Sequence, residues 1–386
     1  MSLLTRKRTI LAKIETVYGT DPTPTGAANA ILVRNVNITP QETEIASRDL
    51  VRPFLGNSEQ LPVAIHAAVD FEVEIAGAGT AGVAPAYGPL LRACGFAELI
   101  LAAAVAGTAQ AGGASTITLA VAASGVDSTY NFFTIRITGG TGSGQSRVIS
   151  GYVGATKVAT VYEAWVTPPD ITSTYSIDAQ VVYAPVSIGF ESATLYFNVD
   201  GVLHKLTGAR STVAMDTNAK AIPVFKFKFM GLYSAVTDTV APTVVFSAWI
   251  KPVPVNGVNT SGLRLHGYST GVLSAMSIDM ANSVVFRSLV GAESVLITDR
   301  KPVGNITLEA GTVAAKDWWS DVKNATTGPL SITHGTVVGN KVIIGAPGVQ
   351  LLKPVYQDLN GVQMLQMGMA LVPGSSGNDE LTISVQ

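Results

Sequence analysis

The fold is decided by the stretch Val224-Phe225-Lys226-Phe227-Lys228-Phe229, in which apolar and charged residues alternate. Successive side chains of a β-strand point to opposite faces of a sheet. The stretch therefore predicts a strand with Phe225, Phe227 and Phe229 on the buried face and the lysines on the other. A second alternation, Val69-Asp70-Phe71-Glu72-Val73-Glu74-Ile75, has the same period. Both indicate half-buried strands.

The rest of the chain favours a mainly β fold. Its 38 glycines and 19 prolines separate short runs rich in threonine and valine, a spacing typical of sandwiches and barrels. Helical patterns are scarce. Two short helices are predicted, Ala86–Cys94 between Pro85 and Gly95, and Ala314–Asn324 around two tryptophans.

The predicted elements occur twice in the same order. The first set is strand Ile31–Ile38, strand Ala68–Gly77, helix Ala86–Cys94, strand Val186–Phe190 and strand Ile222–Tyr233. The second set is Gly271–Met280, Asn305–Gly311, Ala314–Asn324, Leu330–His334 and Gly361–Val372. Local echoes support this order, such as Ala-Pro-Val-Ser-Ile at 184–188 and Gly-Pro-Leu-Ser-Ile at 328–332. We expect an internal duplication, with chance similarity as the alternative.

The spacing differs between the two sets only after the first helix, where an extra stretch carries strands and turns of its own. We interpret it as an inserted small β-module at 104–183. The predicted organisation is a first domain at 1–103 and 184–238, the inserted module, and a second domain at 239–386.

Composition limits the function. Of the 386 residues only 13% are charged, with 25 Lys and Arg against 27 Asp and Glu, while 47% are hydrophobic. Tight nucleic-acid binding needs an excess of cations, which is missing here. The longest apolar run, Leu99–Ala106, is far below the ~20 residues of a membrane span. A weakly charged, apolar surface favours association, so we expect a subunit of an assembly without membrane insertion.

Catalytic and cofactor motifs are weak. Gly77-Ala-Gly79-Thr-Ala-Gly82 matches G-x-G-x-x-G, but prolines shorten the helix that a dinucleotide site needs. The four histidines are scattered and Cys94 is the single cysteine, so neither a metal site nor a disulfide is predicted. No enzyme and no cofactor is expected. The acidic row Asp70, Glu72 and Glu74 is either a solvated strand face or an acidic lining.

Several segments resemble the tail tube (major tail) proteins of long-tailed bacteriophages. They are Leu11–Gly26 with its Tyr-Gly-Thr-Asp-Pro-Thr-Pro, Ala30–Val36, Arg48–Gly56, Pro89–Gly95 and Phe227–Tyr233. The segment Gly142–Tyr175 looks like a small β-module that recurs in phage structural proteins. The resemblance covers most of the chain outside the insert.

The resemblance implies a β-sandwich or barrel domain with a short flanking helix, whose rings close an inner barrel and stack into a tube for DNA. Six such domains usually make a ring. A duplicated chain would then form a homotrimer with pseudo-sixfold symmetry, whereas one domain per chain would form a hexamer. The implied partners are further copies of the chain, tail terminator and distal tail proteins, the tape measure protein, and passing DNA without tight binding. The implied location is the virion tail, after assembly in the host cytoplasm.

Within such a tube, Asp70, Glu72, Glu74 and Glu309 are candidates for the lumen lining, because a lumen must not hold phosphate. The polar stretch Glu42–Leu61 is too long for a simple turn. We assign ring stacking to its residues Arg48, Asp49, Arg52 and Phe54, with an ordinary surface excursion as the alternative.

The flanking parts have expected places too. The N-terminal stretch 1–25 is expected to reach a neighbouring subunit as an arm. The insert is expected on the outer wall, since a lumenal module would block DNA.

Two alternative functions stay open. One is the tube of a phage-derived bacterial particle, such as a bacteriocin or gene-transfer agent. The other is a surface adhesin built from β-modules, which the missing secretory signal disfavours.

Overall fold

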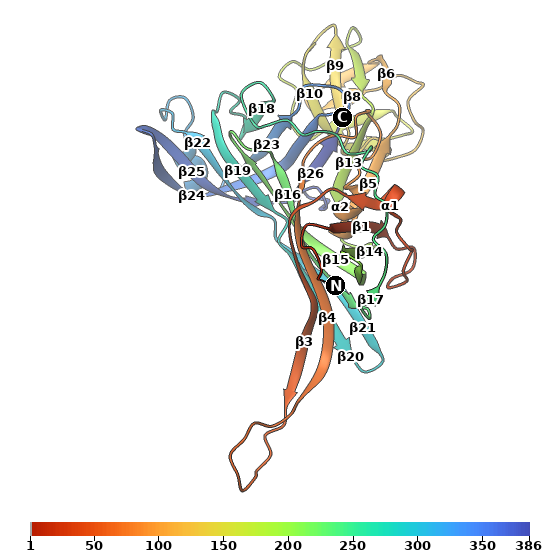
Figure 1. The fold of residues 1–386 in the computed structure, drawn as a ribbon. Helices are drawn as coiled ribbons and strands as arrows, with labels where there is room; N and C mark the ends of the chain where they lie inside the picture. Colours follow the sequence, from red (N-terminus) through yellow and green to blue (C-terminus); the bar gives the residue numbers. More distant parts are fainter. Residues whose placement is uncertain (1) are drawn as a thin grey trace.

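The computed structural model describes residues 2–386 and consists mainly of antiparallel strands (Figure 1). This confirms the mainly β fold class. Helices in the described part are short: α1 (Gly26–Asn29), α2 (Gly88–Ala93) and α3 (Trp318–Lys323). The last two lie inside the helices predicted from the sequence and are shorter than predicted.

Seventeen strands form one continuous hydrogen-bonded sheet. Those up to residue 238 are β1 (Arg8–Ile14), β2 (Ala30–Ile31), β3 (Arg34–Ser47), β4 (Gln60–Glu74), β5 (Phe96–Leu101), β13 (Gln180–Pro185), β14 (Ala193–Val199), β15 (Val202–Asn218), β16 (Val224–Tyr233) and β17 (Thr237–Asp238). The later ones are β18 (Thr260–Leu265), β19 (Leu273–Asp279), β22 (Val303–Glu309), β23 (Thr327–His334), β24 (Val342–Leu359), β25 (Val362–Leu371) and β26 (Thr382–Val385).

Strand pairing runs in the same order in both halves of the chain. In the first half the order is β1-β14-β15-β16-β4-β3. In the second half it is β18-β23-β24-β25-β22-β19. The end of β15 also pairs with β19. The two halves thereby share a row of eight strands, β3-β4-β16-β15-β19-β22-β25-β24.

The strand expected at Val186–Phe190 is wrong. Residues 186–192 lie outside the strands, and Gly189 has a φ of 69°. The place next to β15 is taken by β14, because it pairs with β1 and β15 as β23 pairs with β18 and β24. The echo between 184–188 and 328–332 therefore joins segments that occupy different places in the sheet.

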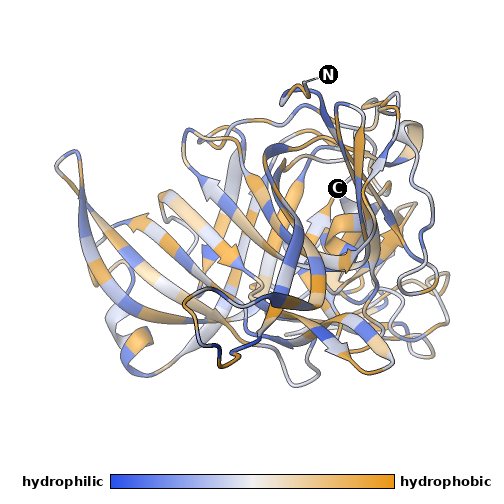
Figure 2. Ribbon diagram, turned by 60° about the horizontal axis from the view of Figure 1, so that its bottom comes forward, coloured by the Kyte–Doolittle hydropathy of each residue, from blue (hydrophilic) through white to orange (hydrophobic). Residues whose placement is uncertain are grey.

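The core lies on one face of the eight-strand row. Phe225, Phe227 and Phe229 are each at most 1% exposed. The ring of Phe71 on β4 lies 5.7 Å from those of both Phe227 and Phe229. Helix α2 adds Leu90, which is fully buried. Figure 2 shows the cause, since hydrophobic and hydrophilic residues alternate along the strands.

A separate seven-stranded sheet forms the inserted module. Its strands are β6 (Val105–Thr108), β7 (Ala111–Gly113), β8 (Thr116–Thr118), β9 (Thr134–Gly139), β10 (Ser146–Val153), β11 (Val158–Val161) and β12 (Thr174–Ile177). It has a core of its own around Ile135, Tyr152 and Trp165. The expected boundary at 183 is too late, because β13 pairs with β5 and β26 in the large sheet.

Two hairpins project in the same direction, toward the bottom of Figure 1. One is β3–β4, and the shorter one is β20 (Asn282–Leu289) with β21 (Ala292–Arg300). The stretch Glu42–Leu61, which the sequence indicated was too long for a simple turn, consists of a paired part and an unpaired tip. Pairing of β3 with β4 continues out to Ser47 and Gln60, so residues 48–59 form the unpaired tip.

The N-terminal stretch is not a free arm over its whole length. Residues Arg8–Ile14 form β1, which pairs with β14 and β2 of the same chain. Glu15 is 7% exposed and accepts hydrogen bonds from three separate segments. Burial of apolar strand residues within the chain holds this stretch in place.

Candidate functional site

The candidate site is the face of the eight-strand row that points away from the core. On β4, Asp70, Glu72 and Glu74 alternate with buried apolar residues and share this face. Glu309 follows the buried Leu308 on β22 and lies on the same face. The four acidic residues singled out from the sequence are therefore on one side of one sheet.

Cations are interleaved with these carboxylates. Arg34 Nε lies 2.9 Å from Glu72 Oε2, and its Nη1 lies 3.8 Å from Glu74 Oε1. The sequence reasoning missed this pairing, because it joins strands β3 and β4. The available signal was the alternation itself, which puts cations and carboxylates on the same side of paired strands.

A second set of ion pairs involves β15 and β16. Lys226 Nζ lies 2.5 Å from Asp216 Oδ2, and the hydrogen bond to Asp216 raises the pKa of the Lys226 ammonium. Lys228 is directly opposite Asp70 on β4. Partial burial raises the pKa of the Asp70 carboxyl, although the Lys228 charge opposes the rise.

Carboxylates outnumber cations on this face. The carboxylates that alternate with core residues are Asp70, Glu72, Glu74, Asp216, Asp279 and Glu309, and the cations are Arg34, Lys226 and Lys228. Six negative and three positive groups give this face of the sheet a net charge of −3 in each chain. This face is strongly polar, and its excess of negative charge disfavours the binding of phosphate groups.

The tip 48–59 carries the four residues singled out for stacking. Arg48 Nη1 lies 3.2 Å from Glu59 Oε2, and Asp49 accepts a hydrogen bond of 3.0 Å from Ser47. The Arg52 guanidinium lies 6.0 Å from the centre of the Phe54 ring. These contacts give the tip local order without burying it.

Apolar exposure at the hairpin tips was not predicted from the sequence. Phe54 is 64% exposed, and Val51 and Leu55 are fully exposed. At the tip of β20–β21, Val290 is fully exposed as well. Exposed apolar side chains concentrated at one end of a protein mark a surface for association.

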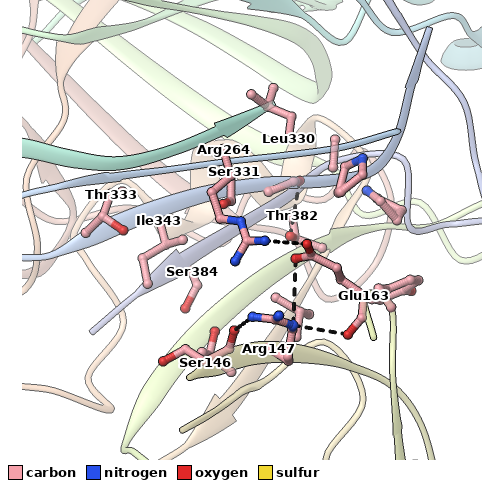
Figure 3. A pocket seen from close by; sticks show the side chains of 18 of the residues that line it. Ser146, Arg147, Glu163, Arg264, Leu330, Ser331, Thr333, Ile343, Thr382 and Ser384 are labelled. Atoms are coloured by element: carbon pink, nitrogen blue, oxygen red, sulfur yellow. Dashed lines mark hydrogen bonds and ion pairs between the residues drawn. The ribbon is translucent and has the colours of Figure 1, made fainter. Parts of the chain in front are cut away.

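The inserted module contacts the second half of the chain through a half-buried ion pair (Figure 3). Arg264 Nη2 on β18 lies 2.5 Å from Glu163 Oε1 in the module. Arg147, which is 5% exposed, donates to the carbonyl oxygens of Ser146, Glu163 and Ala164. Burial lowers the pKa of the Arg147 guanidinium. These residues line a cavity of about 410 Å³, and its polar groups hold the module against the sheet.

Within residues 2–386, no group of three or more His, Cys, Asp and Glu side chains is arranged to hold a metal ion. No helix in this range is both long and apolar enough to cross a bilayer. Cys94 is buried, and burial raises the pKa of its thiol.

The comparison with known protein families matches residues 5–386 to one family, described as phage tail tube protein. The match spans both halves and the inserted module. No curated protein matches the chain significantly. Because the family match covers nearly the whole sequence, the chain belongs to the phage tail tube protein family.

Proposed function

We propose that three copies of this chain form a ring, and that stacked rings make a hollow tube through which DNA passes into the host. Family membership gives the chain a structural role in a virion tail. The observation that carries the finer proposal is the six-strand pairing order that occurs twice in one chain.

The repeated order supports two tube domains per chain. The first comprises 1–103 and 180–238, the second 239–386, and the module near 104–179 is inserted into the first. Six domains that close a ring then require three chains, with pseudo-sixfold symmetry. A hexamer of chains is the outcome that would contradict the duplication.

The polar face of the eight-strand row is suited to line the channel. Its net charge of −3 per chain repels DNA phosphates and offers no counterion release. Asp70, Glu72, Glu74 and Glu309 contribute to this repulsion. The interleaved cations limit it, so that the lumen carries DNA and the tape measure protein without holding either tightly.

The two hairpin tips are suited to ring stacking. They point the same way (Figure 1) and expose apolar side chains, including Val51 and Val290. Docking of both tips on the next ring would remove these side chains from water. At one end of the tube the free tips, and at the other end the surface that receives them, would meet the tail terminator and distal tail proteins. Assembly would take place in the host cytoplasm.

Electron microscopy of the purified chain over a range of concentrations tests the proposal. Hollow tubes or rings with a central opening are expected. A chain that stays monomeric at every concentration, with no rings or tubes, would refute the proposal and favour the adhesin.

A further inference from the structure

The two halves of the chain are joined by the pairing of β15 with β19. The strands at the two ends of the eight-strand row, β3 and β24, have the edges that could form the same kind of pairing between copies. Inside the chain, β15 pairs with β19, with Met215 opposite Ile278 and Asp216 opposite Ser277. At one end of the row, β4 is the only partner of β3 within residues 2–386. Residues 355–359 of β24 pair only with β25 among the described strands. Two unpaired strand edges are thus left open.

Equivalent strand pairings allow residues of the first half to be matched with residues of the second half. Strand β16 from Val224 and β25 from Met364 have matching burial patterns. Following each ladder, Val224 is opposite Asp216, and Met364 is opposite Gln357. Gln357 therefore holds the place of Asp216, and by the same step Tyr356 holds that of Met215.

The other edge follows through β4 and β22. Val224 is opposite Glu74, and Met364 is opposite Glu309, so these two glutamates are equivalent. Counting back along both strands, Val69 corresponds to Gly304. Their partners are Ile38 on β3 and Ile278 on β19. Strand β3 therefore holds the place of β19.

The residues of the internal β15–β19 pairing are buried, whereas the equivalent residues of β24 and β3 are more exposed. Met215 and Ile278, which face each other within the chain, are 2% and 1% exposed. The equivalent Tyr356 is 52% exposed, and Ile38 is only half-buried. The apolar pair is buried at the internal junction, and its equivalent on β24 and β3 is exposed. A further copy of the chain can bury this exposed apolar surface.

We propose that β24 of one copy pairs antiparallel with β3 of the next copy, with Tyr356 opposite Ile38 and Gln357 opposite Asn37. This deepens the proposed function and rests on it, since the pairing continues the strand row around the ring. The pairing ends at Pro40, which has no N–H. At the equivalent internal position Met280 still donates to the Val213 carbonyl.

Cysteine pairs test the register in assembled tubes. The pairs are Ile38→Cys with Tyr356→Cys, and Asn37→Cys with Gln357→Cys. Opposite Cα atoms in an antiparallel pair lie about 4.5 to 5.5 Å apart, within disulfide range. The matched control is Asn37→Cys with Val355→Cys, a diagonal pair about 7 to 8 Å apart. The native Cys94 is buried and stays out of the reaction.

For a directly opposite pair we expect disulfide-linked dimers and closed trimers. Their yield should be at least about tenfold higher than that of the diagonal control. Equal cross-linking of all pairs, or none while tubes are visible, would overturn the register and leave the tube proposal intact. Absence of rings and tubes for the unsubstituted chain would overturn both.

A charge at the edge gives a second readout that does not depend on disulfides. Tyr356→Lys adds a charge to an exposed side chain, so the lone chain should keep its fold. The ring would have to bury that charge, and assembly should fall by about tenfold or more. The control Val166→Lys changes an exposed residue of the inserted module, and assembly should stay within about twofold. Normal assembly of Tyr356→Lys would overturn the pairing.

Discussion

The Glu15 carboxylate joins three segments, and replacing it with glutamine should destabilise the subunit. Its Oε1 accepts from Thr194 Oγ1 at 2.6 Å and from the Gly208 amide at 2.7 Å. Its Oε2 accepts from Ser192 Oγ at 2.6 Å and from the Gly19 amide at 2.8 Å. The side chain is a pure acceptor in a buried place.

Glutamine cannot reproduce this arrangement in either orientation. One backbone N–H points at each carboxylate oxygen, so the new NH₂ group must face an N–H of either Gly19 or Gly208. A hydroxyl can turn and accept, but a backbone N–H cannot. An unpaired buried donor costs about 1–3 kcal/mol, and hydrogen bonds to a charged acceptor are stronger than to a neutral one. We expect Glu15→Gln to lower the free energy of unfolding by about 2–4 kcal/mol.

Urea unfolding of the unassembled subunit, followed by circular dichroism at neutral pH, measures this loss. The control is Glu59→Gln at the exposed hairpin tip, which should change stability by less than about 0.5 kcal/mol. If Glu15→Gln unfolds at the same urea concentration as the unsubstituted chain, the buried acceptor role of Glu15 is refuted.

Three further predictions concern the channel face, the stacking tip and a buried histidine. Changing Asp70 to Lys reverses a charge on the polar face, so DNA binding by tubes, measured by filter retention, should increase. Added salt should reverse this increase. Unchanged DNA binding would contradict the proposal that this face lines the channel. Replacing residues 48–59 with a two-residue Asn-Gly turn should leave rings in electron micrographs but shorten or abolish tubes, and full-length tubes would contradict the stacking role. Burial lowers the pKa of His334 despite its hydrogen bond to the Val253 carbonyl, so the unfolded chain binds the proton first. Stability should fall as pH drops through about 6.5, less so in His334→Asn, and parallel pH profiles of thermal unfolding would contradict this.

Local alternation predicted the buried faces correctly. Phe225, Phe227 and Phe229 face the core, and the acidic residues of β4 face away from it. The period of two depends only on neighbouring residues, so one sequence is enough to read it. The expected duplication rested on the same local patterns, and it stays a prediction.

Pairing between distant segments could not be read in the same way. β14 was missed because its place is set by β1, nearly two hundred residues earlier. The ion pair of Arg34 with Glu72 depends on the register of β3 and β4, which contains bulges. A one-residue slip moves a side chain to the other face.

The number of chains in one ring tests the central claim most directly. Rings released from tubes and fixed by the Tyr356–Ile38 cysteine pair can be weighed by native mass spectrometry. Three chains of 40.0 kDa per closed ring, each with two tube domains, is the predicted result. Six chains per ring would contradict the duplication.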